Sequence, residues 1–364
     1  MISISNPVIG RNEIKAVIKV LSGHTLSQGK EVYTFEQNFS TFCGGKYAIA
    51  TNNGTSALHT ALYAAKIHPG DEVITTPFTF VATVNSILMV RATPVFVDID
   101  PKTYNIDSKK IENAITKKTK AIIAVNLYGQ PCDFSEINAI AKKHKLIIIE
   151  DAAQSVNALY KKRKSGNLTD ISCFSFYATK NITCGEGGIV TTNNKNYFKR
   201  AKQFINQGQK MGRSYEYSDI GYNYRMTNIS AAMLIEQLKR VDWITQKRQS
   251  NASLYNQSFK NLNGLITPSQ PPDRSHVYHQ YTIRITKDFP LTRNKLITYL
   301  EKKGIQARIY YPKLLYYYPH IKKVSVWQKC YNAELAAKEV LSLPTHPSLT
   351  ETDIRNIVKT ILSV

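Results

Sequence analysis

The chain has 364 residues, of which 43% are hydrophobic and 10% aromatic, a composition typical of a globular protein with a substantial core. No apolar stretch approaches the ~20 residues that a membrane-spanning helix needs. The first residues also lack the basic and then apolar pattern of a signal peptide. We therefore expect a cytoplasmic protein with no membrane partner.

The net charge of +22, from 48 lysines and arginines against 26 acidic residues, is the outlier of the composition. A basic surface attracts phosphate, so nucleic acid is one candidate partner. The lysines are spread along the chain in short clusters, however, such as those at 117–118, 142–143 and 322–323, which is typical of a solvated surface. We expect no nucleic-acid partner and only a mild attraction for substrates that carry diphosphate.

The five cysteines are widely spaced, and no two of them have C-x-x-C or metal-ligand spacing. This pattern indicates reduced thiols, as in a cytoplasm, and predicts no metal site. Cys184 lies near Lys180 in the sequence without a neighbouring histidine, so we interpret it as a packing residue rather than a nucleophile.

Hydrophobic periodicity predicts the secondary structure, beginning with a helix and then a loop over residues 12–41. The next elements are a helix at 55–66, a strand at 72–77, a helix at 82–91, strands at 94–98 and 121–125, a helix at 134–143, and strands at 145–150, 172–176 and 188–192. Beyond them the pattern predicts a long helix at 226–255, a strand at 278–285, a helix at 291–303, a strand at 306–311 and a helix at 333–341.

Strands that are apolar throughout and alternate with helices indicate a parallel sheet covered on both faces, and therefore an α/β fold. We place this sheet in a large domain of residues 1–245 and expect a smaller domain of residues 246–364. Parallel sheets bind ligands at the carboxyl ends of their strands, and Asp151 stands at such an end.

Asp151 and Lys180 together predict a pyridoxal phosphate (PLP) site. Asp151 follows the apolar run at 146–149, and Lys180 precedes the glycine-rich turn at 185–188. A lysine can form an imine with the cofactor aldehyde, and a carboxylate can keep the pyridine nitrogen protonated so that the ring accepts electrons. The simpler alternatives are a helix-capping aspartate and a surface lysine.

Two further features are compatible with this cofactor. The run Asn53-Gly54-Thr55-Ser56 opens the helix predicted at 55, and its backbone N–H groups and hydroxyls form either a phosphate cradle or an ordinary helix cap. Phe80 follows a strand end and is either a stacking partner for an aromatic cofactor or a core residue. The spacing alone favours the core residue.

Six motifs stand in the order of a known family. They are Asn53 to Ser56, Thr79 to Thr83, Glu150 to Ser155, Ser175 to Asn181, Gly185 to Gly188 and Gly221 to Met226. Over nearly the whole chain, this order resembles the DegT/DnrJ/EryC1/StrS family of sugar-nucleotide aminotransferases. The resemblance implies the type I fold of PLP-dependent transferases, with a mostly parallel seven-stranded sheet in the large domain, a smaller C-terminal α+β domain, and a homodimer with shared active sites.

The resemblance also implies roles for individual residues. Lys180 would be the catalytic lysine that binds the cofactor covalently, Asp151 would pair with the pyridine nitrogen, and Gln154 would pair with the ring hydroxyl. The phosphate would be held by Gly54, Thr55, Ser56 and Ser175, and by Asn223 of the neighbouring subunit. Phe80 would stack on the ring, and Arg225 would bind substrate.

The activity implied is amino transfer from glutamate to a keto sugar linked to a nucleotide, with a 4-keto-6-deoxyhexose nucleotide as first choice. A 3-keto sugar nucleotide is the alternative, as is a PLP-dependent sugar dehydratase of the same fold. The sequence departs from the family pattern at two places. Asn157 replaces a glycine and, since asparagine tolerates positive φ, we expect the turn to survive. Near Leu314 and Leu315 a histidine that many members carry is missing.

Overall fold

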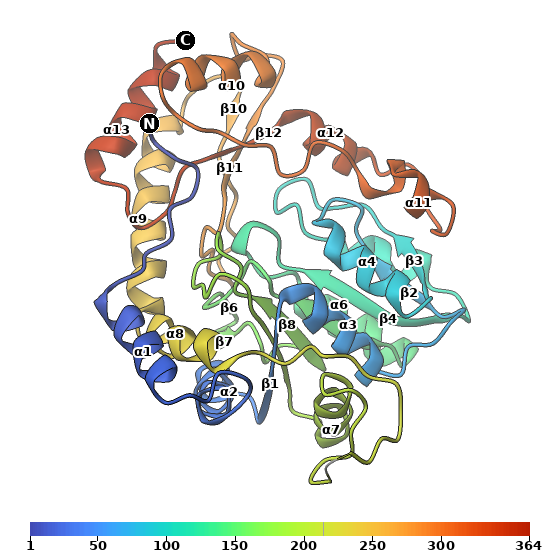
Figure 1. Ribbon diagram of the computed structural model, residues 1–364. Coiled ribbons are helices and arrows are strands. Elements are labelled where there is room, and N and C mark those ends of the chain that lie inside the picture. The colour runs from blue at the N-terminus through green and yellow to red at the C-terminus, as the bar shows by residue number, and fades with distance from the viewer. Residues whose placement is uncertain (214) are drawn as a thin grey trace.

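The computed structural model describes residues 1–213 and 215–364. Its central element is a seven-stranded sheet with the strand order β1-β9-β8-β5-β4-β2-β3 (Figure 1). The strands are β1 (Tyr47–Thr51), β2 (Glu72–Thr75), β3 (Thr93–Phe96), β4 (Thr119–Val125), β5 (Ile147–Asp151), β8 (Ile171–Ser175) and β9 (Gly188–Thr192). Only β9 runs against the other six, so the predicted α/β fold with a mostly parallel sheet is confirmed.

Helices cover both faces of this sheet. Alternate residues of β4 divide between two cores: Ile123 packs with α3 (Gly54–Ala64) and α4 (Val81–Met89), whereas Ile122 packs with α6 (Phe134–His144). Strand side chains point to opposite faces in turn, so burial on both sides requires the continuous apolar runs seen in the sequence.

A second core surrounds a three-stranded sheet of β10 (Leu265–Ile266), β11 (Tyr281–Ile285) and β12 (Val340–Leu343). It also contains residues of α10 (Arg293–Lys302) and α13 (Glu351–Leu362). The helix α9 (Val241–Phe259) runs along the left side of the molecule, from α8 up toward α13 (Figure 1). The predicted division at residue 245 lies within α9 and stays a prediction.

The remaining elements complete the chain. They are α1 (Arg11–Ser22), α2 (Lys30–Cys43), α5 (Ser108–Ile111), η1 (Glu112–Ala114), η2 (Leu127–Gly129), β6 (Leu159–Tyr160), β7 (Arg163–Lys164), α7 (Lys195–Phe204), α8 (Asn228–Lys239), η3 (Leu315–Tyr317), α11 (Pro319–Lys322) and α12 (Tyr331–Glu339). No helix in the described ranges is long and apolar enough to cross a membrane.

Three predicted elements are wrong. The second half of 12–41 forms α2 rather than a loop. The reason is that Val32, Phe35 and Phe39 are fully buried in one core with residues of β1 and β8. The strand predicted at 306–311 makes only one bridge among the described residues, that of Arg308 with Ser342, since the chain turns away toward the site described below.

The long helix predicted at 226–255 is instead two helices, α8 and α9, which meet at Arg240. The backbone of Arg240 has φ −106° and ψ 1°, which is outside helical geometry. Its side chain donates to the buried carboxylate of Glu13 on α1 over 2.9 Å. The apolar period continues across the break, so the sequence pattern did not reveal it.

Candidate active site

A cavity of about 810 Å³ opens at the carboxyl ends of β5 and β8. Asp151, at the end of β5, and Lys180, in the loop between β8 and β9, both line it. The two residues that the sequence singled out therefore share one site, where parallel sheets characteristically bind ligands.

The Lys180 loop is folded back on itself by backbone hydrogen bonds. The N–H of Phe176 donates to Gly187 O over 2.8 Å, and the N–H of Lys180 donates to Tyr177 O over 2.8 Å. Lys180 is half-buried rather than a surface lysine. Burial lowers the pKa of its ammonium group to about 8, although the negative charge of Asp151 opposes that change. The amine is therefore able to exist in its neutral, nucleophilic form near neutral pH.

Asp151 is buried and held from two sides. Its Oδ2 accepts a hydrogen bond from Thr83 Oγ1 over 2.8 Å, and its Oδ1 accepts one from the N–H of Ala153 over 3.2 Å. Burial raises the pKa of the Asp151 carboxyl, while the two hydrogen bonds and the charge of Lys180 lower it. A carboxylate oriented in this way can receive a hydrogen bond from a protonated ring nitrogen in the cavity.

The N-terminus of α3 forms a third wall of the cavity. Asn53 caps the helix by accepting the N–H of Ser56 over 2.8 Å, and Thr55 and Ser56 line the cavity. Gly54 is required by packing, since a Cβ there would lie 2.7 Å from the Cβ of Ser175. This close approach brings the Ser175 hydroxyl beside the helix N-terminus, where an anion is favoured.

Gln154 and Phe80 also line the cavity. Gln154 Oε1 accepts the N–H of Tyr128 over 2.7 Å, and its Nε2 donates to Tyr311 Oη over 3.2 Å, which leaves one N–H free to donate. Phe80 is 55% exposed, so it is not a core residue. Its ring centroid lies 6.2 Å from that of Tyr311.

Asn223 and Arg225 do not line the cavity of their own chain in the part of the structure described. Asn223 is exposed and bridges to Asn206, whose Oδ1 accepts a hydrogen bond from Arg225 Nη1 over 2.6 Å. Their predicted roles toward phosphate and substrate stay predictions.

The sequence reasoning missed Thr83, His279 and Tyr311 as members of the site. Thr79 and Thr83 stand one helical turn apart within a motif that was noted, so their spacing was an available signal. His279 and Tyr311 come from far along the chain, and no local pattern marks them as neighbours of Lys180.

The two departures from the family pattern have clear local outcomes. Asn157 has φ 70°, as expected for a residue that replaces glycine, and its Nδ2 donates to Asp242 Oδ1 over 2.9 Å. Leu314 and Leu315 are buried in the core and do not line the cavity, within the described residues.

The cysteines do not form a reactive centre. All five are unpaired, and burial raises the pKa of Cys184 to about 12, which fits the predicted packing role. Across residues 1–213 and 215–364 no cluster of three or more histidine, cysteine or acidic side chains has metal-binding geometry.

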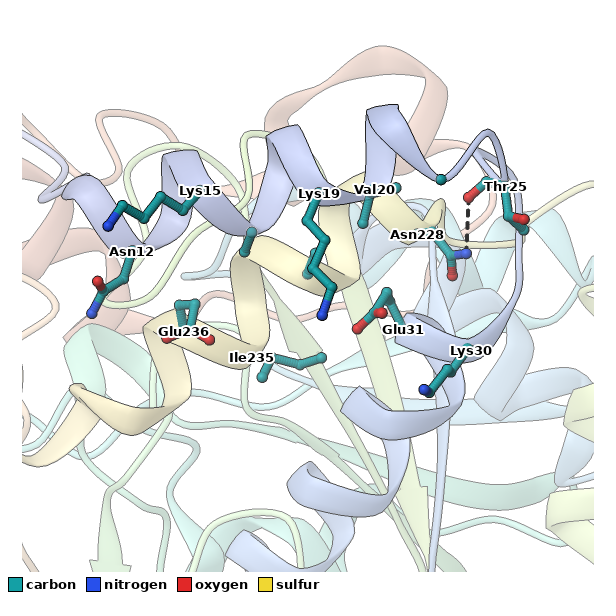
Figure 2. Close-up of a pocket in the computed structure, with 13 residues that line it drawn as sticks. Asn12, Lys15, Lys19, Val20, Thr25, Lys30, Glu31, Asn228, Ile235 and Glu236 are labelled. Carbon is teal, nitrogen blue, oxygen red and sulfur yellow. Dashed lines mark hydrogen bonds between the residues drawn. The ribbon is translucent and has the colours of Figure 1, made fainter.

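A second hollow, of about 560 Å³, lies between α1, α2 and α8 (Figure 2). Figure 2 shows Lys15 and Lys19 on α1 above Glu236 on α8 and Glu31 on α2. None of the predicted cofactor residues lines this hollow. The predicted cofactor residues Gly54, Asp151 and Lys180 line the larger cavity instead.

Comparison with known proteins identifies the class. The model of the DegT/DnrJ/EryC1/StrS aminotransferase family matches residues 7–362. The chain belongs to this family, whose members are PLP-dependent enzymes.

Individual relatives agree with this assignment. GDP-perosamine synthase of Caulobacter vibrioides is 40% identical over 361 residues, which cover 98% of this chain and 96% of the relative. UDP-2-acetamido-2-deoxy-3-oxo-D-glucuronate aminotransferase of Pseudomonas aeruginosa is 39% identical over 330 residues, 90% of this chain and 89% of the relative. The PLP form of Streptococcus pneumoniae Spr1654 superposes with a TM-score of 0.93 at 28% identity, covering 100% of this chain and 98% of that one.

Proposed function

We propose that this chain transfers the amino group of glutamate to a keto sugar joined to a nucleoside diphosphate, with PLP as its cofactor. The observation that carries the proposal is the shared cavity of Lys180 and Asp151, with the N-terminus of α3 as its third wall. When bound, PLP supplies an electron-accepting ring that takes up and releases an amino group.

The residues present fit this cofactor. Thr55, Ser56 and Ser175 would hold the phosphate at the N-terminus of α3, where backbone N–H groups and the helix dipole favour an anion. Asp151 would pair with the ring nitrogen, and the free N–H of Gln154 would donate to the ring hydroxyl.

Two residues complete the cofactor site and its chemistry. Phe80 offers an exposed ring face for stacking. Lys180 would hold the cofactor covalently between turnovers and carry a proton at Nζ while its amine is free, a task suited to an amine whose pKa lies near 8.

The homodimer is part of the proposal, because one chain offers few cations to its own cavity. Lys180 is the only lysine or arginine among the described residues that line it. Glutamate and a nucleoside diphosphate are both anionic and require positive partners. We therefore assign Arg225 to the substrate of the neighbouring subunit. We also assign Asn223, a neutral hydrogen-bond donor, to that subunit's phosphate, in shared active sites.

The most specific part of the proposal is the identity of the acceptor sugar. Our first choice is a 4-keto-6-deoxyhexose nucleotide, and the product would be an amino sugar nucleotide for a surface polysaccharide or glycan. A 3-keto sugar nucleotide is the alternative, which the similarity to the 3-oxo-glucuronate aminotransferase supports. A dehydratase of the same fold is disfavoured, since this chain keeps Lys180. The unpaired cysteines support a cytoplasmic location.

The test combines spectroscopy with product analysis. The purified chain with PLP should show the visible absorbance of covalently bound cofactor, which Lys180→Ala should lose and the exposed control Lys142→Ala should keep. Incubation with glutamate alone should release about one equivalent of 2-oxoglutarate per active site, and only the true acceptor among the 4-keto and 3-keto sugar nucleotides should sustain release beyond that equivalent. Product mass separates the gain of an amine from the loss of water. Wild-type turnover by Lys180→Ala would refute the proposal.

A further inference from the structure

The segment 276–280 is held by hydrogen bonds to Gly129 and to α9. The N–H of Val277 donates to Gly129 O over 2.9 Å, and Arg248 Nη1 on α9 donates to Tyr278 O over 3.0 Å. Gly129 has φ 104°, and a Cβ there would lie 2.9 Å from the backbone nitrogen of His279. The position of His279 is therefore fixed by close backbone packing as well as by hydrogen bonds.

Asn181 determines which ring nitrogen of His279 carries the proton. Asn181 Nδ2 donates to the carbonyl of Val277 over 3.3 Å, so its Oδ1 is the atom that lies 3.2 Å from His279 Nδ1. A carbonyl oxygen only accepts, so Nδ1 must be the donor. Burial holds the pKa of His279 well below its ordinary value, and the nearby positive charges of Lys180 and Arg248 add to this effect. The ring is neutral, and its Nε2 is a hydrogen-bond acceptor.

The acceptor Nε2 faces the cavity. Within the described part of the chain, Nε2 makes no hydrogen bond. The side-chain nitrogen and oxygen atoms that are both fully buried and unbonded do not include Nε2, so this atom is accessible. It therefore reaches open space, and the open space that His279 lines is the cavity of Lys180. Asn181, which fixes the ring, is also the residue that follows Lys180 in the chain.

We propose that His279 is a positioning residue for Lys180, fixed as the Nδ1–H tautomer by Asn181, with Nε2 as the acceptor of an N–H from the free Lys180 ammonium group. This role rests on the proposed function of Lys180. It gives the amine a defined place when it is not bound to cofactor. The other charged groups near this site are Asp151 on β5, Glu186 in the Lys180 loop and Arg248 on α9, and all three stay unchanged in the test below.

The first measurement is the pH midpoint of the Lys180 amine, followed as the rate at which the cofactor-free full-length chain captures PLP. His279→Asn keeps an N–H near the place of Nδ1 for Asn181 and removes the acceptor at the place of Nε2. Since an acceptor stabilises the ammonium form, the midpoint should fall by about one pH unit. His279→Gln, whose side-chain oxygen reaches the place of Nε2, should restore it.

The control is His276→Asn, in the same buried segment. His276 Nδ1 accepts the N–H of Tyr278 over 2.9 Å, a bond that asparagine can replace, and His276 does not line the cavity. Its midpoint should equal that of the wild type. A wild-type midpoint in a folded His279→Asn chain would overturn the role of His279, whereas failure of the wild type to capture PLP at Lys180 would overturn the proposed function instead.

The second measurement is made on the wild-type chain, and a variant serves only to assign the resonances. In a sample with ¹⁵N-labelled histidine, the Nδ1 resonance of His279 should be that of a protonated nitrogen and the Nε2 resonance that of a bare one. The resonances are assigned by their loss in His279→Gln. An Nε2–H tautomer, or a charged ring at neutral pH, would contradict the proposal.

Discussion

Thr83 on α4 donates its hydroxyl hydrogen to Oδ2 of Asp151 at the end of β5, over 2.8 Å. Behind it, the hydroxyl oxygen of Thr79 lies 3.1 Å from that of Thr83. The carboxylate is thereby tied to the turn before α4 as well as to its own strand. Burial raises the pKa of Asp151, and the hydrogen bond from Thr83 opposes this rise. The hydroxyl of Thr83 thus helps to keep Asp151 ionised for its proposed partner.

Thr83→Val should reduce kcat/KM without unfolding the protein. Valine has nearly the shape of threonine but cannot donate, and a hydrogen bond to a charged group contributes about 1.5–3 kcal/mol, so we expect a loss of roughly ten- to a hundredfold. Steady-state kinetics with thermal unfolding measures it. Thr60→Val is the matched control, since the Thr60 hydroxyl on α3 is buried and has no partner among the described residues. Equal activity of the two variants would contradict the role of Thr83.

The capture of PLP by the cofactor-free chain should depend on pH through Lys180. Only the neutral amine attacks, and burial lowers the pKa of Lys180 to about 8, so the rate should rise with pH and level off above pH 8. Asp151→Asn should lower this midpoint, because the Asp151 carboxylate raises the Lys180 pKa. Stopped-flow absorbance gives both values. A midpoint near the ordinary 10.5 would show that the amine is not desolvated.

The same pKa predicts how stability depends on pH. Lys180 binds its proton more weakly in the folded chain than in the unfolded chain, so its protonated form destabilises the fold. Without cofactor, Lys180→Met should therefore unfold at a higher temperature than the wild type at pH 7. The difference should shrink as the pH rises from 8 to 10.5, where the wild-type amine becomes neutral in both states. Calorimetric scans across this range measure it, and a difference that is constant with pH would be inconsistent with the lowered pKa.

Gly54→Ala should weaken cofactor binding. The added Cβ would lie 2.7 Å from the Cβ of Ser175, so the N-terminus of α3 must move away from β8, at a cost of about 1–3 kcal/mol for overpacking. The proposed phosphate donors on both sides would then separate, and PLP should dissociate more readily. Equilibrium dialysis measures the affinity. Gly23→Ala at the end of α1 is the control, since its Cβ would meet only ordinary contacts of 3.4 Å or more.

Mixing two inactive variants should restore activity if the active sites are shared. A dimer of one Lys180→Ala chain and one Asn223→Ala chain would contain one site with both defects and one intact site. Random exchange of subunits would then give about a quarter of the wild-type activity. The mixture is assayed after mild dissociation and reassociation, with each variant alone as the reference. No recovery in a mixture shown to contain mixed dimers would place Asn223 in its own chain's site or outside any site.

The sequence by itself determined the parallel sheet and the pairing of Asp151 with Lys180. Apolar runs identify buried strands because both faces of such a sheet exclude water, and the ends of parallel strands meet at one edge. Any residue that follows a strand can therefore be placed from its position alone. The family resemblance placed Gly54, Ser56 and Ser175 at the same site, and all three line this cavity.

Only the tertiary structure decided the rest. Arg240 at the break donates a hydrogen bond to Glu13 of α1, and the lining of the cavity includes His279 and Tyr311, which come from the chain beyond α9. Hydrophobic periodicity records which face of an element is buried but not which distant segment covers it. That pattern does not change with a single ψ angle, such as that of Arg240. Nor does it change with a hydrogen bond between residues about a hundred positions apart, such as that of His279 with Asn181.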